Sequence, residues 1–410
     1  MDEMKILELV DSYYPAVDGV INAVKNYSKE LNKIASCKLA VPKASKKAQY
    51  VDSEEFDVYR CHSMGAPENY RNAFPTLDWD FLELIEKEQV DIMHVHSPFS
   101  MGYFAVDVAR EKNVPLVATL HTRYFDDFMR VTKSKILSKV ALSYIMHVYK
   151  NADSVWTVSD AAKSVLREYG YKGKVEVVRN GTDFTYPENA EELINKVNEK
   201  HNLSGQKNVF LFVGRIALYK NVLMICDAMK ILKERGCDFK MVFVGGGFDF
   251  ETLKKYVDKN KLNDVCILTG EIKDRSDLQG YYLRSDLLIF PSTFDTSGIV
   301  KFEAAAHKTP ALLIEGSCSA ETVEDGVNGF LCQENANSIA DKISEVILDE
   351  DKLKSVSEKA FATLYRPWSV VAEEVKAKYA EIISEYAKKQ RKKERLERFR
   401  KAFRKRKKQK

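Results

Sequence analysis

The feature that most constrains this chain is the regular alternation of short apolar runs with longer helical stretches. Residues 208–213 are typical of these runs, since they are apolar almost without interruption rather than at every second position. Such runs indicate strands buried on both faces, as in a parallel sheet covered by helices. The strand candidates are residues 4–10, 37–41, 56–60, 90–95, 114–120, 153–158, 175–178, 208–213, 239–244, 265–269, 286–290, 311–314 and 329–332.

The alternation restarts near Asn208, which predicts two domains. Residues 185–205 are polar, carry Pro187 and hold no strand candidate, so we expect the interdomain connection there. The predicted fold class is α/β, with two doubly wound domains that face each other across a ligand cleft at the carboxyl ends of both sets of strands. The expected divisions are 1–187, 188–365, a crossover helix at 366–387 that returns to the N-terminal domain, and a tail at 388–410. Helices are expected at 19–31, 137–150, 222–235, 250–259 and 338–348.

Several classes of protein are excluded. The seven cysteines are scattered without a CxxC pair, which is typical of a reduced cytosolic protein without disulfides or a thiolate zinc site. No apolar run approaches the roughly 20 residues of a membrane span, and we expect no signal peptide because residues 4–10 lead straight into a globular pattern. His94 and His96 have no carboxylate or third histidine beside them in the sequence, so we expect no metal site.

Two cations follow the apolar run at 208–213. Gly214 ends the predicted strand, Arg215 follows it directly, and Lys220 comes five residues after Arg215. Ligands bind at the carboxyl ends of strands in α/β domains, and an Arg–Lys pair there suits a diphosphate. The alternative is two solvated surface cations.

A polar loop and a helix start follow the predicted strand at 286–290. The backbone N–H groups at the start of this helix, near Gly298, would form an anion site without a charged side chain. Asp295 and Glu303 lie eight residues apart in the same region, and a carboxylate can accept hydrogen bonds from the adjacent hydroxyls of a ribose or hexose. The alternative is an acidic residue favoured by the helix dipole and an ordinary helical glutamate.

Two further motifs lie in the N-terminal half. His121 follows the apolar run at 114–120, where an imidazole can hydrogen-bond a sugar or stabilise charge; a purely structural histidine is the alternative. Gly19 follows the first strand and permits close backbone approach at the start of the first helix.

Taken together, these motifs resemble family 4 of the glycosyltransferases, which are retaining enzymes of the GT-B fold. The resemblance spans about residues 4–387 and includes the Gly-Val-Asn-Gly-Phe turn at 326–330 and the final helix that contains Trp368. It implies that Arg215 and Lys220 neutralise a leaving nucleoside diphosphate and that Gly19 approaches it. It also implies a backbone segment for phosphate and sugar, formed by Ser297, Gly298, Ile299 and Val300.

The resemblance assigns four further residues. It implies that His121 lies near the donor sugar and the reaction centre, that Asp295 lies near the sugar hydroxyls, and that Glu303 holds the ribose hydroxyls. Ile272 would pair with the base through its backbone. Two departures leave the donor sugar open: Asp295 stands where the family usually has Glu, and Ser297 where it commonly has Phe.

The net charge of +4 conceals an uneven distribution. Residues 388–410 contain 15 of the 64 Lys and Arg residues and 2 of the 60 acidic residues, which gives this segment a net charge of +13. The remainder of the chain contains 49 basic and 58 acidic residues, which gives it a net charge of −9. Leu396, Phe399 and Phe403 would share one face of a helix among these basic residues. The pattern favours an amphipathic tail on an anionic membrane surface; a disordered tail and nonspecific RNA binding are the alternatives.

Residues 94–99 and 121–127 are similar to those of bacterial diacylglycerol glucosyltransferases. We therefore expect transfer of a hexose, glucose from UDP-glucose being the first choice, to diacylglycerol or a related lipid by an enzyme at the inner face of the cell membrane. No cofactor, metal or specific nucleic acid is expected. The alternatives are a polysaccharide, teichoic-acid or small soluble acceptor, another GT-B activity such as nucleotide-sugar epimerisation, and a non-catalytic membrane- or RNA-binding protein of the same fold.

Overall fold

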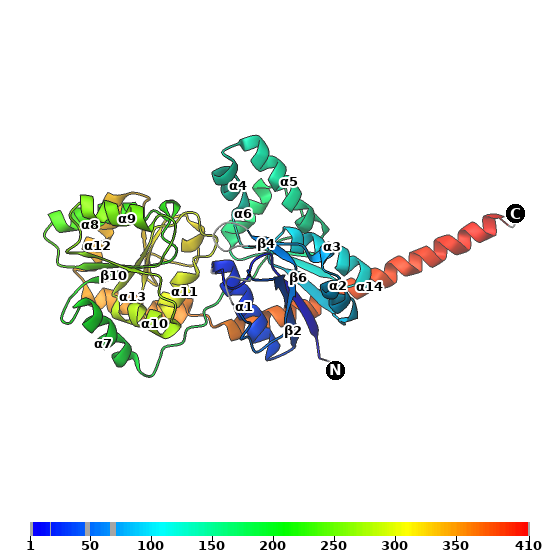
Figure 1. Cartoon of the computed structure of the whole chain (residues 1–410), viewed down its shortest axis with the longest axis horizontal. Coiled ribbons are helices and arrows are strands. Elements are labelled where there is room, and N and C mark those ends of the chain that lie inside the picture. The colour runs from blue at the N-terminus through cyan, green and yellow to red at the C-terminus, as the bar shows by residue number, and fades with distance from the viewer. Residues whose placement is uncertain (1–2, 17, 46–49, 66–70, 409–410) are drawn as a thin grey trace. The chain divides into compact units, whose positions relative to one another are not determined.

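The chain folds into two compact α/β units (Figure 1). The computed structural model describes residues 3–16, 18–45, 50–65 and 71–408, with side chains described as far as Arg398 and at Arg400. The first unit contains residues 1–158, 163–179 and 368–410, and the second contains 159–162 and 180–367.

The first unit is built on a seven-stranded parallel sheet of order β3-β2-β1-β6-β7-β8-β9. In chain order its strands are β1 (Lys5–Leu9), β2 (Ser36–Pro42), β3 (Val58–Cys61), β6 (Ile92–Val95), β7 (Leu116–Leu120), β8 (Ser154–Thr157) and β9 (Glu176–Val177). Each coincides with a strand candidate of the sequence. The antiparallel pair β4 (Ser63–Gly65) and β5 (Arg71–Ala73) was not predicted, because neither strand has an apolar run.

Helices cover both faces of this sheet (Figure 1). They are α1 (Gly19–Asn32), α2 (Trp79–Lys87), α3 (Ser100–Lys112), α4 (Tyr124–Thr132), α5 (Lys135–Asn151) and, from residue 163 onward, α6 (Asp160–Glu168), with a 3₁₀ turn η3 (Pro75–Leu77). The Asp18 side chain caps α1 by accepting a hydrogen bond from the Ile21 N–H at 2.8 Å, which fixes the start of α1 beside the end of β1.

The second unit has a six-stranded parallel sheet of order β12-β11-β10-β13-β14-β15. In chain order its strands are β10 (Val209–Val213), β11 (Lys240–Val244), β12 (Cys266–Gly270), β13 (Leu287–Phe290), β14 (Ala311–Ile314) and β15 (Phe330–Cys332). β10 lies at the point where the strand order reverses and is buried along its whole length. The apolar runs of this half therefore became the parallel strands that they predicted.

The helices of the second unit include one in the segment expected to be a plain connection. They are α7 (Ala190–His201), α8 (Val222–Glu234), α9 (Phe250–Lys259), α10 (Arg275–Arg284), α11 (Ile299–Ala306), α12 (Ala336–Val346) and α13 (Glu350–Leu364), with 3₁₀ turns η4 (Leu218–Lys220) and η5 (Cys318–Ala320). α7 packs on α10 and buries Leu193 and Val197. Its apolar positions are few, so the polar composition of the segment concealed a short amphipathic helix.

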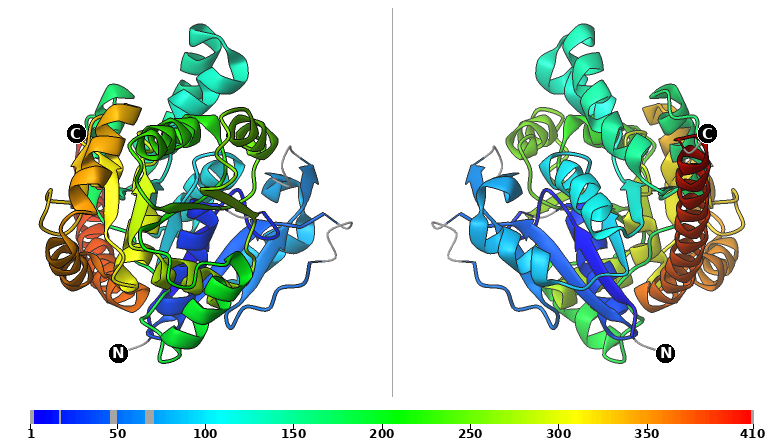
Figure 2. Two further views of the ribbon diagram at one scale, coloured as in Figure 1. Left: turned by 90° about the vertical axis from the view of Figure 1, so that its left-hand side faces the viewer. Right: turned by 90° about the vertical axis from the view of Figure 1, so that its right-hand side faces the viewer.

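A single helix, α14 (Trp368–Lys408), ends the described chain and belongs to the first unit (Figure 2). Its first half packs on α1, and Val371, Ala372, Val375 and Tyr379 are buried. The predicted crossover helix and the tail are thus one continuous helix, which from residue 387 onward is almost wholly exposed where side chains are described. Within the described residues, no helix combines the length and the apolar character that crossing a bilayer requires.

Candidate active site

In the second unit, two glycine-containing loops pack together beyond the central strands. Gly214 follows β10 and Gly245 follows β11, and a Cβ on Gly245 would lie only 1.9 Å from the carbonyl oxygen of Gly214. The Ile216 N–H donates to the Gly246 carbonyl at 2.8 Å, which ties the two loops together. Residues 245–247 were missed at the level of sequence, although three successive glycines after an apolar strand would have marked them. They fix the backbone that carries Arg215, which is half-buried.

The structure brings Lys220 and Asp295 together. The Lys220 ammonium lies 2.8 and 2.9 Å from the two carboxylate oxygens of Asp295, and both side chains are largely buried. Ser292 donates a third hydrogen bond to this carboxylate. Lys220 ends η4 after β10, whereas Asp295 lies in the loop after β13, so neighbouring strands bring one charge each to the same edge of the sheet.

Residues 297–300 form the start of α11, as the sequence predicted. Gly298 caps the helix in the left-handed conformation, with φ 61° and ψ 59°. A Cβ there would lie 2.7 Å from Ser319 Oγ, so both the conformation and the space call for glycine. The first turn of α11 supplies amide N–H groups that have no partner within the helix. Lys301, which sequence reasoning missed, is buried beneath this turn, where its ammonium donates to the Ser319 carbonyl.

Glu303 lies within α11 and is buried with partners that the sequence did not indicate. The Tyr282 hydroxyl donates to one of its oxygens at 2.6 Å, and the Arg275 guanidinium donates to the other at 3.2 Å. Arg275 also pairs with Asp183 and stacks on the Phe184 ring at 3.9 Å. Burial lowers the pKa of Arg275, but Glu303 and Asp183 outweigh it and hold the pKa above its ordinary value. Each carboxylate oxygen of Glu303 can still accept a further hydrogen bond. Ile272 lies in the loop after β12 and is half-buried against the core of the unit.

In the first unit, Gly19 is exposed as the first residue of α1. A buried carboxylate organises the neighbouring loop. Asp11, after β1, accepts hydrogen bonds from the Ser97 hydroxyl at 2.8 Å and from the Phe99 and Met101 N–H groups at 3.1 and 2.8 Å. Burial raises the pKa of Asp11 to about 6 although these hydrogen bonds lower it. The loop between β6 and α3 is therefore held against the end of β1.

His121 directly follows β7 and belongs to a buried chain of hydrogen bonds. Its Nε2 lies 2.9 Å from His96 Nδ1, and His96 Nε2 lies 2.5 Å from Glu8 Oε2. Tyr379, on α14, donates to the other oxygen of Glu8 at 2.8 Å. Glu8 and Tyr379 were missed at the level of sequence, and His96 was considered there only as a metal ligand and as part of the 94–99 segment. The one available sign was a glutamate inside the otherwise apolar run at 4–10.

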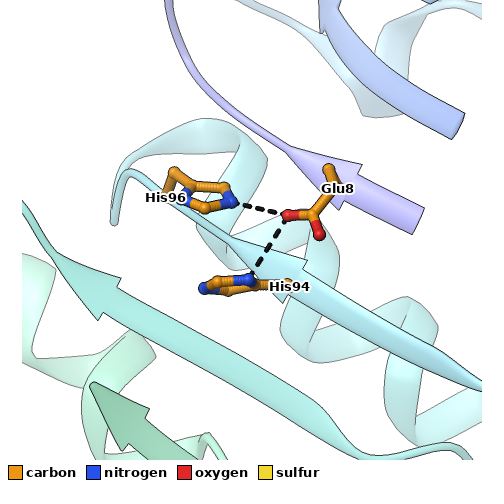
Figure 3. Close-up of side chains that lie close together, drawn as sticks. All are labelled: Glu8, His94 and His96. Atoms are coloured by element: carbon orange, nitrogen blue, oxygen red, sulfur yellow. Dashed lines mark hydrogen bonds and ion pairs between the residues drawn. The ribbon is translucent and has the colours of Figure 1, made fainter. Parts of the chain in front are cut away.

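Glu8, His94 and His96 lie close enough together to be considered as metal ligands (Figure 3). The carboxylate that was lacking beside the two histidines in the sequence is supplied by β1, where Glu8 is in register with His94. The ring nitrogens of both histidines, however, already have protein partners. His94 Nδ1 lies 2.5 Å from the Tyr379 hydroxyl and His94 Nε2 lies 2.7 Å from Thr119 Oγ1. A metal ion would have to replace these hydrogen bonds in a fully buried cluster, so the geometry favours a hydrogen-bonded network.

Burial makes this cluster electrically neutral near pH 7. It raises the pKa of Glu8 from 4.5 to about 8, although the Tyr379 hydrogen bond lowers it. It lowers the pKa of His96 to about 3 and holds the pKa values of His94 and His121 well below their usual range. Glu8 is therefore mostly protonated and the three imidazoles are uncharged at neutral pH.

Two family sequence models cover most of the chain. Residues 17–186 match the family described as Glycosyltransferase Family 4, and residues 175–363 match the family described as Glycosyl transferases group 1. The two matches together include every site residue that the sequence predicted, from Gly19 to Glu303, whereas Glu8, Asp11 and Tyr379 lie outside them.

Two similar proteins share one name. The chain is 27% identical over 316 residues to alpha-monoglucosyldiacylglycerol synthase of Streptococcus pneumoniae. The aligned region covers 75% of this chain and 70% of that protein. It is 22% identical over 410 residues to alpha-monoglucosyldiacylglycerol synthase of Acholeplasma laidlawii. This aligned region covers 95% of this chain and 100% of that protein. The second likeness extends over nearly the whole chain.

A solved structure with a similar fold is that of the Anabaena protein HepE in complex with UDP and glucose. The two chains superpose with a TM-score of 0.74 at 17% identity, over 92% of this chain and 99% of that one. At this identity the likeness shows the fold, which is GT-B as the sequence predicted.

Proposed function

The chain belongs to family 4 of the glycosyltransferases, and from this premise we propose that it transfers a hexose, glucose from UDP-glucose being our first choice, to diacylglycerol or a related membrane lipid. The observation that carries this proposal is the likeness over nearly the whole chain to a protein named alpha-monoglucosyldiacylglycerol synthase. The donor is supported by HepE, a protein of the same fold that was solved with UDP and glucose.

The second unit offers a suitable binding site for the donor. The diphosphate would be bound by Arg215, Lys220 and the N–H groups at the start of α11, where the helix dipole also favours an anion. Glu303 would accept hydrogen bonds from the ribose hydroxyls, and Arg275 and Tyr282 hold its carboxylate in place. The backbone at Ile272 would pair with the base.

These groups can also perform the chemistry that a retaining transfer demands. As the glycosidic bond to the diphosphate breaks, negative charge grows on the leaving oxygen and positive charge on the sugar. Preorganised cations and N–H groups that point at the leaving oxygen lower the free energy of this transition state, and this electrostatic contribution is usually the largest one. The carboxylate of Asp295 holds the Lys220 ammonium by two hydrogen bonds, so the cation is in place before the reaction. We propose that no metal ion is needed.

The exposed end of α14 supports an acceptor in a membrane. Residues 388–398 form a continuous, almost wholly exposed helix rich in Lys and Arg, and Leu396 is 51% exposed among them. Figure 1 shows this end of the helix extending beyond the sheet of its unit. The Phe399 and Phe403 side chains of the predicted apolar face lie outside the described residues. Basic residues close to an anionic bilayer contribute about 1 kcal/mol each.

A second surface of the first unit supports the same conclusion. The hairpin of α4 and α5 stands out from the sheet (Figures 1 and 2). Its outward side carries large exposed apolar side chains at Val131, Ile136, Leu137, Val140 and Tyr144, which are 49–83% exposed. An apolar surface of this kind on one hairpin is typical of a site that contacts a membrane or another protein.

The charge of the hairpin favours an anionic bilayer. Lys133, Lys135 and Lys139 are exposed on it, whereas its two acidic residues, Asp126 and Asp127, form ion pairs with Arg123 and Arg130. Apolar side chains next to lysines suit the surface of an anionic membrane. The apolar side chains enter the acyl region, and the lysines face the lipid phosphates. We therefore propose a peripheral enzyme on the inner face of the cell membrane.

The experiment that tests this function is product analysis. The purified full-length chain is given a panel of nucleotide sugars together with total lipid extract, and the products are identified by mass spectrometry. We expect a hexosyl-diacylglycerol formed from UDP-glucose. A glycosylated polysaccharide or soluble product, with no glycolipid, would contradict the lipid acceptor, and the absence of both transfer and UDP-sugar hydrolysis would contradict catalysis.

Flotation with vesicles tests the membrane proposal separately. The full chain is compared with a chain that ends at Ala387 and with the triple variant Ile136→Ser, Leu137→Ser, Val140→Ser. Leu348→Ser, at an apolar position on the second unit that is 85% exposed, is the control. We expect both test proteins to float less with anionic vesicles than the full chain and the control do. Equal flotation of the full chain with neutral and anionic vesicles would contradict the electrostatic part of the proposal.

A further inference from the structure

We propose that Glu8 and His96 are positioning residues that set which ring nitrogen of His121 carries the proton. This inference rests on the proposed location of His121 near the reaction centre. It concerns a chain of three side chains, Glu8 on β1, His96 after β6 and His121 after β7, joined by contacts of 2.5 and 2.9 Å. All three are buried, with exposures of 0, 0 and 7%.

A hydrogen-bonded chain of this kind allows only two arrangements of protons. Each contact needs one donor and one acceptor, and a neutral imidazole has one nitrogen of each type. When Glu8 is protonated, it donates to His96 Nε2, His96 Nδ1–H donates to His121 Nε2, and the proton of His121 is on Nδ1. When Glu8 is ionised, it accepts from His96 Nε2–H, His96 Nδ1 accepts from His121 Nε2–H, and His121 Nδ1 has no proton.

The passage between the two arrangements removes one proton in total. His121 Nδ1 releases a proton to solvent or ligand, His121 Nε2 takes the proton of His96 Nδ1, and His96 Nε2 takes the proton of Glu8. No bond between heavy atoms changes. The protonation state of a fully buried carboxyl group is thereby expressed at the far nitrogen of His121, as a hydrogen-bond donor or as an acceptor.

The surroundings of Glu8 favour the protonated arrangement at neutral pH. The groups that face it are Tyr379 on α14, His94 on β6, His96 directly after β6, and Cys37 on β2, while Tyr27 on α1 packs edge-on against both histidines. Burial holds His94, His96, Cys37 and Tyr379 neutral near pH 7, so none of these four offers a positive charge to the carboxylate. His121 should then present Nδ1–H, a donor suited to a sugar hydroxyl oxygen, and lose it as the pH rises through about 8.

His94 offers a matched control. It shares the buried cluster and lies 3.3 Å from Glu8, but its two ring nitrogens contact Tyr379 and Thr119, whereas those of His96 contact Glu8 and His121. A merely structural cluster predicts similar effects for substitutions at 94 and 96. The positioning role predicts an effect on His121 for His96 alone.

The test is the ¹⁵N spectrum of the histidine rings in the full-length protein, which distinguishes the two tautomers directly. In the wild type we expect His121 as the Nδ1–H tautomer at pH 7 and as the Nε2–H tautomer at pH 9. Glu8→Gln, whose amide donates as the protonated acid does, should keep Nδ1–H at both pH values. His96→Phe should give a mixture, and His94→Gln should resemble the wild type.

Kinetics supply the second measurement. His96→Phe should lower kcat roughly 10–100-fold, by analogy with the loss of the partner that orients a metal-bound histidine, with a smaller change in KM for the donor. Glu8→Gln should remove the step in the pH profile near pH 8. Identical His121 spectra in wild type and Glu8→Gln at pH 9 would overturn the role of Glu8, and identical spectra in wild type and His96→Phe would overturn that of His96. The spectra need no substrate, so failure to find a glycolipid product would contradict the proposed function alone.

Discussion

The two units place polar side chains at the same position of the same kind of sheet, yet the chemistry of the two groups is opposite. In the second unit the groups beyond the strands are ionic, with Lys220 against Asp295 and Arg275 against Glu303. In the first unit the cluster of Glu8, His94, His96 and His121 consists of imidazoles and a carboxyl group that burial keeps neutral. Under the proposed function this difference would be a division of labour, in which one unit would stabilise the charge of a diphosphate and the other would offer uncharged hydrogen-bonding groups.

The largest expected effect comes from removing the cations of the second unit. Arg215→Ala and Lys220→Ala should each lower kcat by roughly 10²–10³-fold, by comparison with the loss of one oxyanion donor elsewhere, because the leaving diphosphate loses a charge that faces it. Steady-state transfer assays measure this effect, with circular dichroism to verify the fold. Lys254→Ala, on exposed α9, is the control and should have no effect. Equal activity of the control and the two test variants would contradict the proposed role of the second unit's cations in stabilising the diphosphate.

A smaller effect is expected at the start of α11. Gly298→Ala forces a left-handed conformation on a residue with a Cβ and brings that Cβ within 2.7 Å of Ser319 Oγ. The conformation alone costs about 1–2 kcal/mol, and displacement of the helix start should also raise KM for the donor. Gly205→Ala is the matched control, since its φ of 75° gives the same strain and no atom lies within 4 Å of the added Cβ. Thermal unfolding and donor KM separate the strain, which both variants share, from the clash at Ser319. A KM that is unchanged in both variants would argue against donor contact at α11.

The neutral cluster predicts a pH-dependent stability. Glu8 holds its proton more tightly when folded, with a pKa of about 8, than at its ordinary value of 4.5. The free energy of unfolding of the wild type should therefore contain a contribution that is complete below pH 4.5 and is lost as the pH rises to about 8. Glu8→Gln lacks this titration, so its stability relative to the wild type should increase between pH 5 and 8 and then level off. Urea unfolding at several pH values measures the difference; a constant difference would mean that Glu8 is not buried as a neutral acid.

The smallest expected effect is that of a chelator. If the cations and helix start of the second unit supply all of the positive charge, transfer activity in EDTA should equal that in buffer. Calcium-loaded EDTA, which cannot remove weakly bound magnesium to the same extent, controls for effects of the chelator itself. Activity that disappears in EDTA and returns with magnesium or manganese would contradict this expectation and would reopen the Glu8, His94 and His96 cluster as a metal site.

Much of the fold could be predicted because parallel strands that are buried on both faces need apolar side chains at nearly every position, and such strands are visible in the sequence as apolar runs. The run at 208–213 became β10, and the polar loop after 286–290 leads into α11 as expected. Helix α7 was missed because two buried side chains, Leu193 and Val197, are enough to anchor it. The β4–β5 pair has no periodic pattern at all.

The candidate site could be predicted from the sequence only in part, for a different reason. Lys220 and Asp295 were chosen separately, but their ion pair depends on which strands are neighbours, and that order follows from packing over the whole sheet. Glu8 and Tyr379 lie 371 residues apart and meet because α14 returns to the first unit. No local pattern in the sequence contains such a contact.

The continuity of α14 limits where insertions and deletions can be tolerated in this helix. Tyr379 reaches Glu8 from the buried face of a helix that begins at Trp368. Inserting or deleting one residue between these positions would turn everything beyond it by about 100° and carry the hydroxyl away from the carboxyl group. Beyond residue 387, where the described side chains are almost all exposed, the same change would shift no packed side chain. Homologous chains should therefore differ in the length of the basic extension but keep the spacing from 368 to 379 intact.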